Sequence, residues 1–77
     1  MPTMHRIGRV EIRIYRRGEH NPPHIHVVTR SAGATIRIDT GAVLRGALPP
    51  KIERSVRRWL ADNRAETLRR WHDVTGL

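Results

Sequence analysis

Three of the five histidines lie within seven residues, in the segment His20-Asn21-Pro22-Pro23-His24-Ile25-His26. On an extended strand, His24 and His26 would share one face, with their side chains about 6.5–7 Å apart along the chain. Pro22 and Pro23 fix φ and lack an N–H donor, so the connector before the strand is stiff and resists joining a sheet ladder. Either X–Pro bond can be cis. This segment is the strongest candidate for a functional site.

One interpretation of the cluster is metal-free acid–base cleavage of RNA. In that chemistry one imidazole removes the proton of the 2′-hydroxyl, a second protonates the leaving oxygen, and a cation stabilises the phosphorane. Histidine titrates near neutral pH, so both of its protonation states are accessible. The catalytic residues would be His24 and His26, with Arg37 or Arg13 as the cation.

A second interpretation is a metal site. Its ligands would be the imidazoles of His20, His24 and His26, with Asp39 or Glu11 as a fourth ligand or a supporting group. The His-x-His spacing suits two ligands on a strand, but the surrounding arginines disfavour a cation. The histidines alone also leave a tetrahedral set of four incomplete. No cofactor is therefore expected, with zinc as the alternative.

A third interpretation is structural. His20 and Asn21 would cap the loop, while His24 and His26 would form hydrogen bonds with neighbouring groups or part of an interface. Clusters of titratable groups also occur for such structural reasons. The sequence leaves the three interpretations open.

Cationic side chains far outnumber anionic ones, with 15 Lys+Arg against 7 Asp+Glu and a formal net charge of +8 at pH 7. All but one of the cations are arginines, whose planar guanidinium binds phosphate and carboxylate and stacks on bases. This charge favours a nucleic acid or an acidic protein as partner, although an arginine-rich composition alone would give the same surface. The candidates for nucleic-acid binding are Arg13, Tyr15, Arg16, Arg17 and Arg37.

The first half of the chain alternates apolar and polar residues, the period of half-buried strands. Strands are predicted over 9–15, 24–30 and 34–39, and a short fourth strand or a connection over 42–45. Turn-forming residues separate them. The expected buried side chains are Val10, Ile12, Ile14, Ile25, Val27, Ile36 and Ile38. The opposite face is expected to carry Arg9, Glu11, Arg13, Tyr15, His24, His26, Thr35, Arg37 and Asp39.

The second half has helical periodicity. A helix is predicted to start at Pro49-Pro50 and to bury one stripe of apolar side chains. The stripe consists of Ile52, Val56, Trp59 and Leu60. Asn63 followed by Glu66 resembles a capping box, which predicts a second helix that ends at Gly76. The second helix is expected to bury Leu68, Trp71 and Val74. The break before Asn63 predicts either an αα-hairpin or a sharply kinked helix.

Together these elements predict a single α+β domain over 1–77. A three- or four-stranded, mostly antiparallel sheet over 1–46 would be followed by a C-terminal helical hairpin over 49–76, packed on one face of the sheet. The chain has no cysteine, which is consistent with a reducing compartment. It has neither the apolar segment of a signal peptide nor one long enough to span a membrane. A cytoplasmic protein is therefore expected.

The chain also resembles a known family through four segments. These are the opening Met1-Pro2-Thr3, the strand from Ile7-Gly8 onward, the block His20-Asn21-Pro22-Pro23-His24-Ile25-His26-Val27 and the ending Asn63-Arg64-Ala65-Glu66-Thr67-Leu68-Arg69-Arg70-Trp71. They look like the bacterial domain-of-unknown-function family 4160, and the resemblance covers essentially the whole chain. The motif residues map onto His20, Asn21, Pro22, Pro23, His24, His26 and Trp71. Members of this family are often encoded beside a member of domain-of-unknown-function family 2442, as in a toxin–antitoxin module.

The resemblance implies that this protein is the toxin and that its partner is an antitoxin-like protein of the family-2442 type. Together with the histidines and the arginines, it leads us to expect action on RNA or the translation machinery, with a His-dependent ribonuclease as one form of it. One alternative is a non-enzymatic basic module that binds an acidic protein or a nucleic acid. Another is a small His-based metal-binding protein. A homodimer through a free sheet edge is a further expectation.

Overall fold

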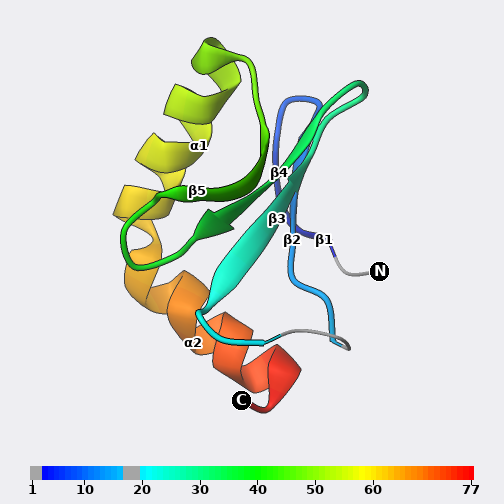
Figure 1. Cartoon of the computed structure of the whole chain (residues 1–77). Helices are drawn as coiled ribbons and strands as arrows, with labels where there is room; N and C mark the ends of the chain where they lie inside the picture. The colour runs from blue at the N-terminus through cyan, green and yellow to red at the C-terminus, as the bar shows by residue number, and fades with distance from the viewer. Residues whose placement is uncertain (1–2, 17–19) are drawn as a thin grey trace.

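The computed structural model describes residues 3–16 and 20–77, so Arg17 lies outside the described residues. Within them the chain forms a five-stranded antiparallel sheet, in the order β1-β2-β3-β4-β5, followed by α1 and α2 (Figure 1). The strands are β1 (Thr3–Ile7), β2 (Val10–Arg13), β3 (His24–Val28), β4 (Gly33–Arg37) and β5 (Val43–Ala47). The helices are α1 (Pro50–Asp62) and α2 (Arg64–Thr75). The predicted α+β class, antiparallel sheet and C-terminal helices are confirmed.

Strand β1 was not predicted and brings the count in the described residues to five rather than three or four. It pairs with β2 through a two-residue turn, because Ile7 stands opposite Val10 in the register. Gly8 occupies the first turn position with φ of 60°, the left-handed conformation that tight hairpin turns favour. The sheet is thus a meander in which each strand pairs with the next one in sequence.

The other strands are close to their predicted places, but they end earlier than the alternation suggested. The second strand ends at Arg13, the third at Val28 and the fourth at Arg37. Asp39, predicted on a strand, lies in a turn that is closed by a hydrogen bond from the Gly41 amide to the Arg37 carbonyl. Of the two alternatives for 42–45, a strand or a connection, the structure has the strand, β5, shifted by one or two residues.

The helices follow one another along the same side of the sheet with a break at Asn63 (Figure 1), which corresponds to the kinked alternative. Pro50 begins α1 and Gly76 ends α2 in the left-handed conformation, as predicted. The prediction of a capping box is wrong. The Asn63 side chain makes no cap bond to α2 and donates instead to the Trp59 carbonyl, 2.9 Å away. Among the described residues, no helix is both long and apolar enough to cross a bilayer.

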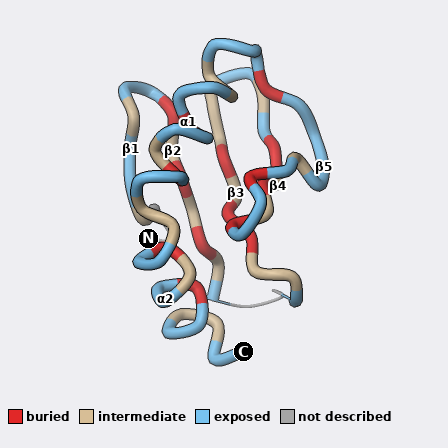
Figure 2. The backbone as a smooth tube through the Cα atoms, turned by 90° about the vertical axis from the view of Figure 1, so that its left-hand side faces the viewer, coloured by how far each residue is buried: buried red, intermediate tan, exposed pale blue. Residues whose placement is uncertain are grey.

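The hydrophobic core lies between the helices and one face of the sheet (Figure 2). Every side chain predicted to be buried on that sheet face is buried. From the helices, the core receives Val56, Leu60 and Trp71. Trp59, Ile52, Leu68 and Val74 are partly buried against it. Because side chains alternate along a strand, covering this face leaves the polar residues on the other one.

Candidate functional site

The polar residues of the central strands share the sheet face opposite α1 and α2, here called the distal face. Strand register places His26 between Arg13 on β2 and Thr35 on β4, and it places His24 opposite Arg37. Arg45 on β5 stands opposite Thr35. Since directly opposite residues point to the same side of a sheet, the register brings the predicted catalytic set of His24, His26 and Arg37 to one face.

His24 is the more enclosed of the two strand histidines, with only 4% of its surface exposed. Its Nδ1 lies 2.7 Å from the Pro22 carbonyl oxygen. A carbonyl oxygen can only accept, so Nδ1 carries a hydrogen and donates it. The preceding Asn21–Pro22 peptide bond is cis, one of the two candidates. The hydrogen bond from His24 Nδ1 ties the imidazole to the proline connector that precedes the strand.

Aromatic and imidazole rings form a continuous group at this end of the sheet. The ring centroids are 4.6 Å apart for Tyr15 and His26, 5.1 Å for His26 and His24, and 5.7 Å for His24 and His20. His24 also lies 6.1 Å from Trp71, where α2 runs past the start of β3 (Figure 1). The fully buried Trp71 therefore connects the histidine group to the core, as the interpretation of this tryptophan as a core residue predicted.

The arginines of the distal face are held by neighbouring acceptors. Arg13 donates to the Tyr15 hydroxyl at 3.4 Å and to the Glu11 carboxylate at 3.2 Å, and these hydrogen bonds raise the pKa of Arg13. Arg37 forms a two-pronged pair with Asp39, which raises the pKa of Arg37 and lowers that of the Asp39 carboxyl. Each guanidinium is thereby oriented by its partner before any ligand arrives.

A shallow hollow opens on the distal face beside the ring group. Its polar lining comes from Tyr15, His26, Thr35 and Arg45, and Gly46 forms part of its floor. Arg45 was not among the predicted site residues, because the segment around it was not assigned firmly to a strand. Arg16 is exposed after β2 and does not line the hollow, and Arg17 lies outside the described residues.

The histidines do not assemble into a metal site within the part of the chain that the structure describes. In residues 3–16 and 20–77, no group of three or more histidine, aspartate or glutamate side chains is arranged to hold an ion. His20, His24 and His26 lie in a row, and His24 Nδ1 already donates to a carbonyl oxygen. The row can instead position imidazoles next to a phenol and guanidinium groups, the side chains that acid–base chemistry on a phosphate uses.

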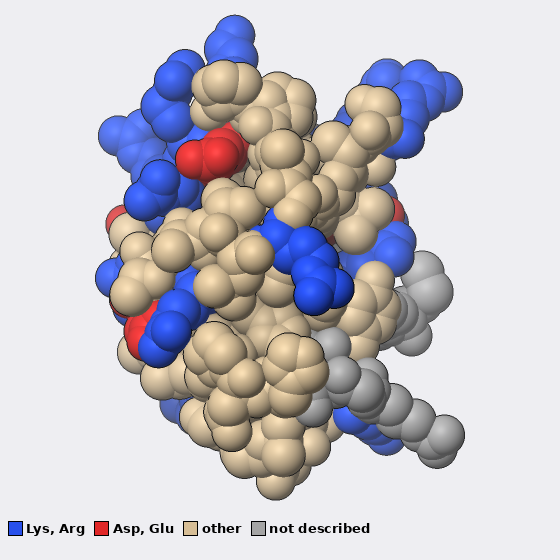
Figure 3. Space-filling view, in the orientation of Figure 1, with Lys and Arg blue, Asp and Glu red and all other residues tan. Residues whose placement is uncertain are grey.

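Cationic side chains also gather away from the histidines. Figure 3 shows them over the outer surface of α1 and at the tip of the β3–β4 hairpin. On α1 they line a shallow depression formed by Lys51, Arg54, Ser55, Arg57 and Arg58. Among the described residues, only Arg57 of these cations forms an ion pair, with Glu53 at 3.4 Å. The positive charge is therefore spread over both sides of the molecule.

Comparison with known proteins gives a family and no closer relative. No curated protein and no solved structure matches the chain. The family model described as "Domain of unknown function (DUF4160)" matches residues 10–72. The match runs from β2 into α2 and includes the whole histidine block. It confirms the resemblance noted in the sequence, and the chain belongs to the DUF4160 family.

Proposed function

We propose that this protein binds single-stranded RNA on the distal face of its sheet and cleaves it there, as the toxin of a two-gene bacterial module. One observation carries the proposal. The helices cover one sheet face, and the other combines imidazole, phenol and guanidinium groups around a hollow. Cations that follow a phosphate backbone, together with rings on which bases stack, are what single-stranded nucleic-acid sites require.

Binding would use the hollow beside Tyr15 and His26. The two rings meet edge to face at 4.6 Å, so one ring can stack a base while the other borders the adjacent sugar. Arg45 lines the same hollow and provides a cation for the backbone. Arg13 contributes to the order of the site, because its bond to the Tyr15 hydroxyl holds the phenol in place.

Cleavage would start from His26, which is only half-buried. Its imidazole removes the 2′-hydroxyl proton, the 2′-oxygen attacks the phosphorus, and the bond to the 5′-oxygen breaks. A second imidazole returns a proton to that leaving oxygen, so the products are a 2′,3′-cyclic phosphate and a 5′-hydroxyl. The exposed His20 is more accessible to an RNA strand than the enclosed His24, which contacts both other imidazoles and would act as a positioning residue. Arg37 would stabilise the phosphorane.

The module part of the proposal has a different basis. It rests on the likeness of the histidine block to proteins encoded beside a family-2442 neighbour, and the family to which the chain belongs is itself described as one of unknown function. The partner would be the antitoxin. Expression of this protein alone would slow bacterial growth, and co-expression of the neighbour would restore it. If His26→Asn slowed growth as much as wild type does, the toxicity would not depend on the proposed chemistry.

The direct test uses purified full-length protein and a labelled oligoribonucleotide of about 12 nucleotides, a length that one small domain can bind. Wild type is expected to produce cyclic-phosphate ends with or without EDTA. His26→Asn keeps a polar side chain of similar shape and should bind RNA without cleaving it. The matched control is His72→Asn, since His72 is exposed near the end of α2, and it should cleave like wild type.

Each other outcome removes a defined part of the proposal. Cleavage retained by His26→Asn would overturn the role of His26. Cleavage abolished by EDTA would overturn the metal-free chemistry. Tight RNA binding without cleavage by wild type would leave a binding protein only. A folded wild-type protein that does not bind RNA would overturn the whole function.

A second candidate function is favoured by the outer surface of α1. Lys51, Arg54 and Arg58 follow one another at spacings of three and four residues, so they form one stripe along the helix. All three are exposed, and no described carboxylate pairs with them. This stripe suits a non-enzymatic module that binds an acidic protein. Such a module predicts a complex whose affinity falls steeply with salt and is lost in Arg54→Gln/Arg58→Gln. A salt-insensitive complex would contradict it.

A further inference from the structure

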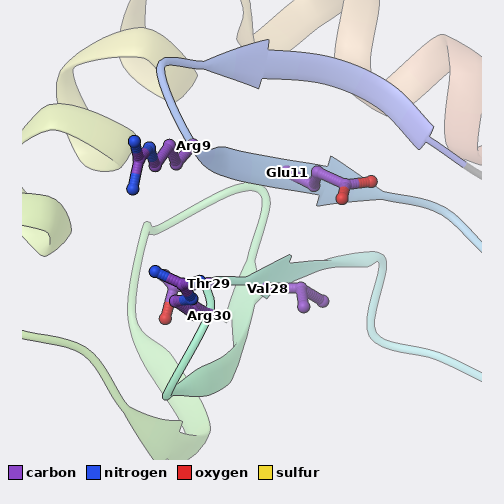
Figure 4. Close-up of a pocket in the computed structure, with 5 residues that line it drawn as sticks. All are labelled: Arg9, Glu11, Val28, Thr29 and Arg30. Atoms are coloured by element: carbon purple, nitrogen blue, oxygen red, sulfur yellow. The ribbon is translucent and has the colours of Figure 1, made fainter.

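Two arginines face each other at the tips of neighbouring hairpins. The last paired residues of β2 and β3 at this end are Glu11 and Val28. Continuing the antiparallel register by two residues on each strand places Arg9, in the β1–β2 turn, opposite Arg30, in the β3–β4 turn. Both residues line one pocket together with Glu11, Val28 and Thr29 (Figure 4).

The backbone that carries these arginines is fixed by short turns. The two-residue turn at Gly8-Arg9 is set by the pairing of Ile7 with Val10. In the other turn, the Thr29 hydroxyl donates to the Ala32 carbonyl at 3.0 Å and accepts from the Ala32 amide at 2.8 Å. The Thr29 amide also donates to the Ala32 carbonyl, at 2.8 Å. Neither arginine can therefore move away by simple rearrangement of a long loop.

The two arginines in this pocket have no ion-pair partner within residues 3–16 and 20–77. Like charges at facing positions of neighbouring strands destabilise a sheet. Glu11 lines the pocket, but its Oε1 is occupied by Arg13 at 3.2 Å and by Arg6 at 3.7 Å. In Figure 4 its carboxylate points away from the end where the two guanidinium groups lie. The pocket thus holds two cations whose repulsion a bound anion would relieve.

We propose that this pocket, between the tips of the two hairpins, binds a backbone phosphate of single-stranded RNA. Guanidinium groups from two sides can each donate paired N–H bonds to phosphate oxygens. The pocket continues the distal face, because Glu11 and Val28 stand in line with Arg13 and His26 across the same pair of strands. Arg30 follows His26 by four residues, or about 13 Å along an extended chain. A mononucleotide at the ring group would not reach it, whereas a longer strand running along β2 and β3 would.

This inference rests on the proposed function and specifies the path of the RNA. The test compares Arg9→Gln/Arg30→Gln with Arg54→Gln/Arg58→Gln, which removes the same charge from exposed positions on α1. Fluorescence anisotropy gives the affinity for a labelled oligouridine over a range of salt concentrations. If Arg9→Gln/Arg30→Gln loses one phosphate contact, the slope of the logarithm of the association constant against log salt should become shallower by about 0.7. At 0.1 M salt this corresponds to an affinity about fivefold weaker than that of wild type. The α1 variant should bind like wild type, and uridine monophosphate should bind all three proteins equally.

Other results would overturn the inference or the function separately. Equal losses in the two double variants would show that only net charge matters, and an unchanged Arg9→Gln/Arg30→Gln would show that the pocket is not used. In both cases the wild type still binds RNA, so the proposed function stands. If the wild type binds no RNA, the function fails. The inference that the pocket binds an RNA phosphate then fails with it, and titration of the Arg9 and Arg30 Nε–H signals with inorganic phosphate shows whether the pocket is instead a site for the free anion.

Discussion

Gly46 should be the least replaceable glycine among those that the structure describes. It lies on β5 opposite Ala34 with φ of 76°, next to an irregularity in the β4–β5 register. A Cβ at this position would overlap the carbonyl oxygen of Gly33 and lie 3.1 Å from the Ala34 Cα. Both neighbours are backbone atoms, so neither can yield by a side-chain rotation. Gly46→Ala therefore requires β5 to move away from β4.

The cost follows from two contributions. Placing a Cβ in the left-handed region costs roughly 1–2 kcal/mol. Separating the strands weakens the hydrogen bonds beside Gly46, at about 1 kcal/mol for each of two bonds. Gly76→Ala isolates the first contribution, because Gly76 has φ of 75° and nothing within 4 Å of the added Cβ. Gly46→Ala should therefore be about 2 kcal/mol less stable than Gly76→Ala.

Urea unfolding followed by circular dichroism measures this difference. A chain of 77 residues has a free energy of unfolding of about 4–12 kcal/mol, so Gly76→Ala should stay folded. With an m-value of about 1 kcal/mol/M, the midpoints of the two variants should differ by about 2 M. Equal midpoints would refute the close packing of β5 on β4. Because Gly46 also lines the hollow beside Tyr15 and His26, Gly46→Ala should weaken RNA binding as well.

Two further substitutions test contacts that orient the site and its support. Hydrogen bonding to Arg37 lowers the pKa of Asp39, so this pair stabilises the fold above the unfolded pKa of about 3.9 and stops doing so as pH falls through the lower folded value. The urea midpoint of wild type should exceed that of Asp39→Asn at pH 7, and the difference should shrink as the pH is lowered and Asp39 is protonated. A difference that does not depend on pH would contradict the pairing. Thr67 is fully buried and its hydroxyl donates to the Asn63 carbonyl at 2.7 Å, so Thr67→Val should cost about 1 kcal/mol in the same assay. Thr75→Val is the control, because Thr75 is only half-buried. If Thr75→Val lost as much stability as Thr67→Val, burial of the hydroxyl would not explain the loss.

The sequence was sufficient to predict the orientation of a strand where one of its faces is buried. The alternation of Val10, Ile12 and Ile14 predicted which side of β2 meets the helices, because a slip by one residue would turn all three outward. The same reasoning placed Ile25 and Val27 correctly on β3. It therefore also predicted that His24 and His26 share the opposite face, before any neighbouring strand was known.

Edge strands were harder to predict for a physical reason. On β1, the exposed His5 and Arg6 stand between the half-buried Met4 and Ile7, so no alternation appears. Most of β5 is exposed, and its sequence carries little pattern. A strand at the edge of a sheet has one partner fewer and buries less surface, so its residues are less constrained. The signal that could have located β1 is Gly8-Arg9, a two-residue hairpin turn between apolar residues.

The site could be predicted as a set of residues but not as a set of contacts. The burial of His24 depends on Trp71, which lies 47 positions later in the chain and meets the ring only because α2 extends past the sheet. Arg45 reaches the hollow through the register of β4 and β5. Such proximity depends on how strands align across loops, and a single sequence does not specify this alignment.

The distribution of ion pairs separates arginines that organise the site from those that can attract a ligand. Arg13 and Arg37 are each bound to a nearby carboxylate, so much of their charge is already compensated. Arg13 holds the Tyr15 hydroxyl, and Asp39 holds Arg37 in a fixed orientation on the face where the proposed reaction takes place. Arg9 and Arg30 have no such compensation among the described residues. A ligand phosphate gains more from an uncompensated pair than from one that must first exchange a partner. The histidine end of the distal face is thus equipped to position a reacting group, and the hairpin end to hold the chain on which it reacts.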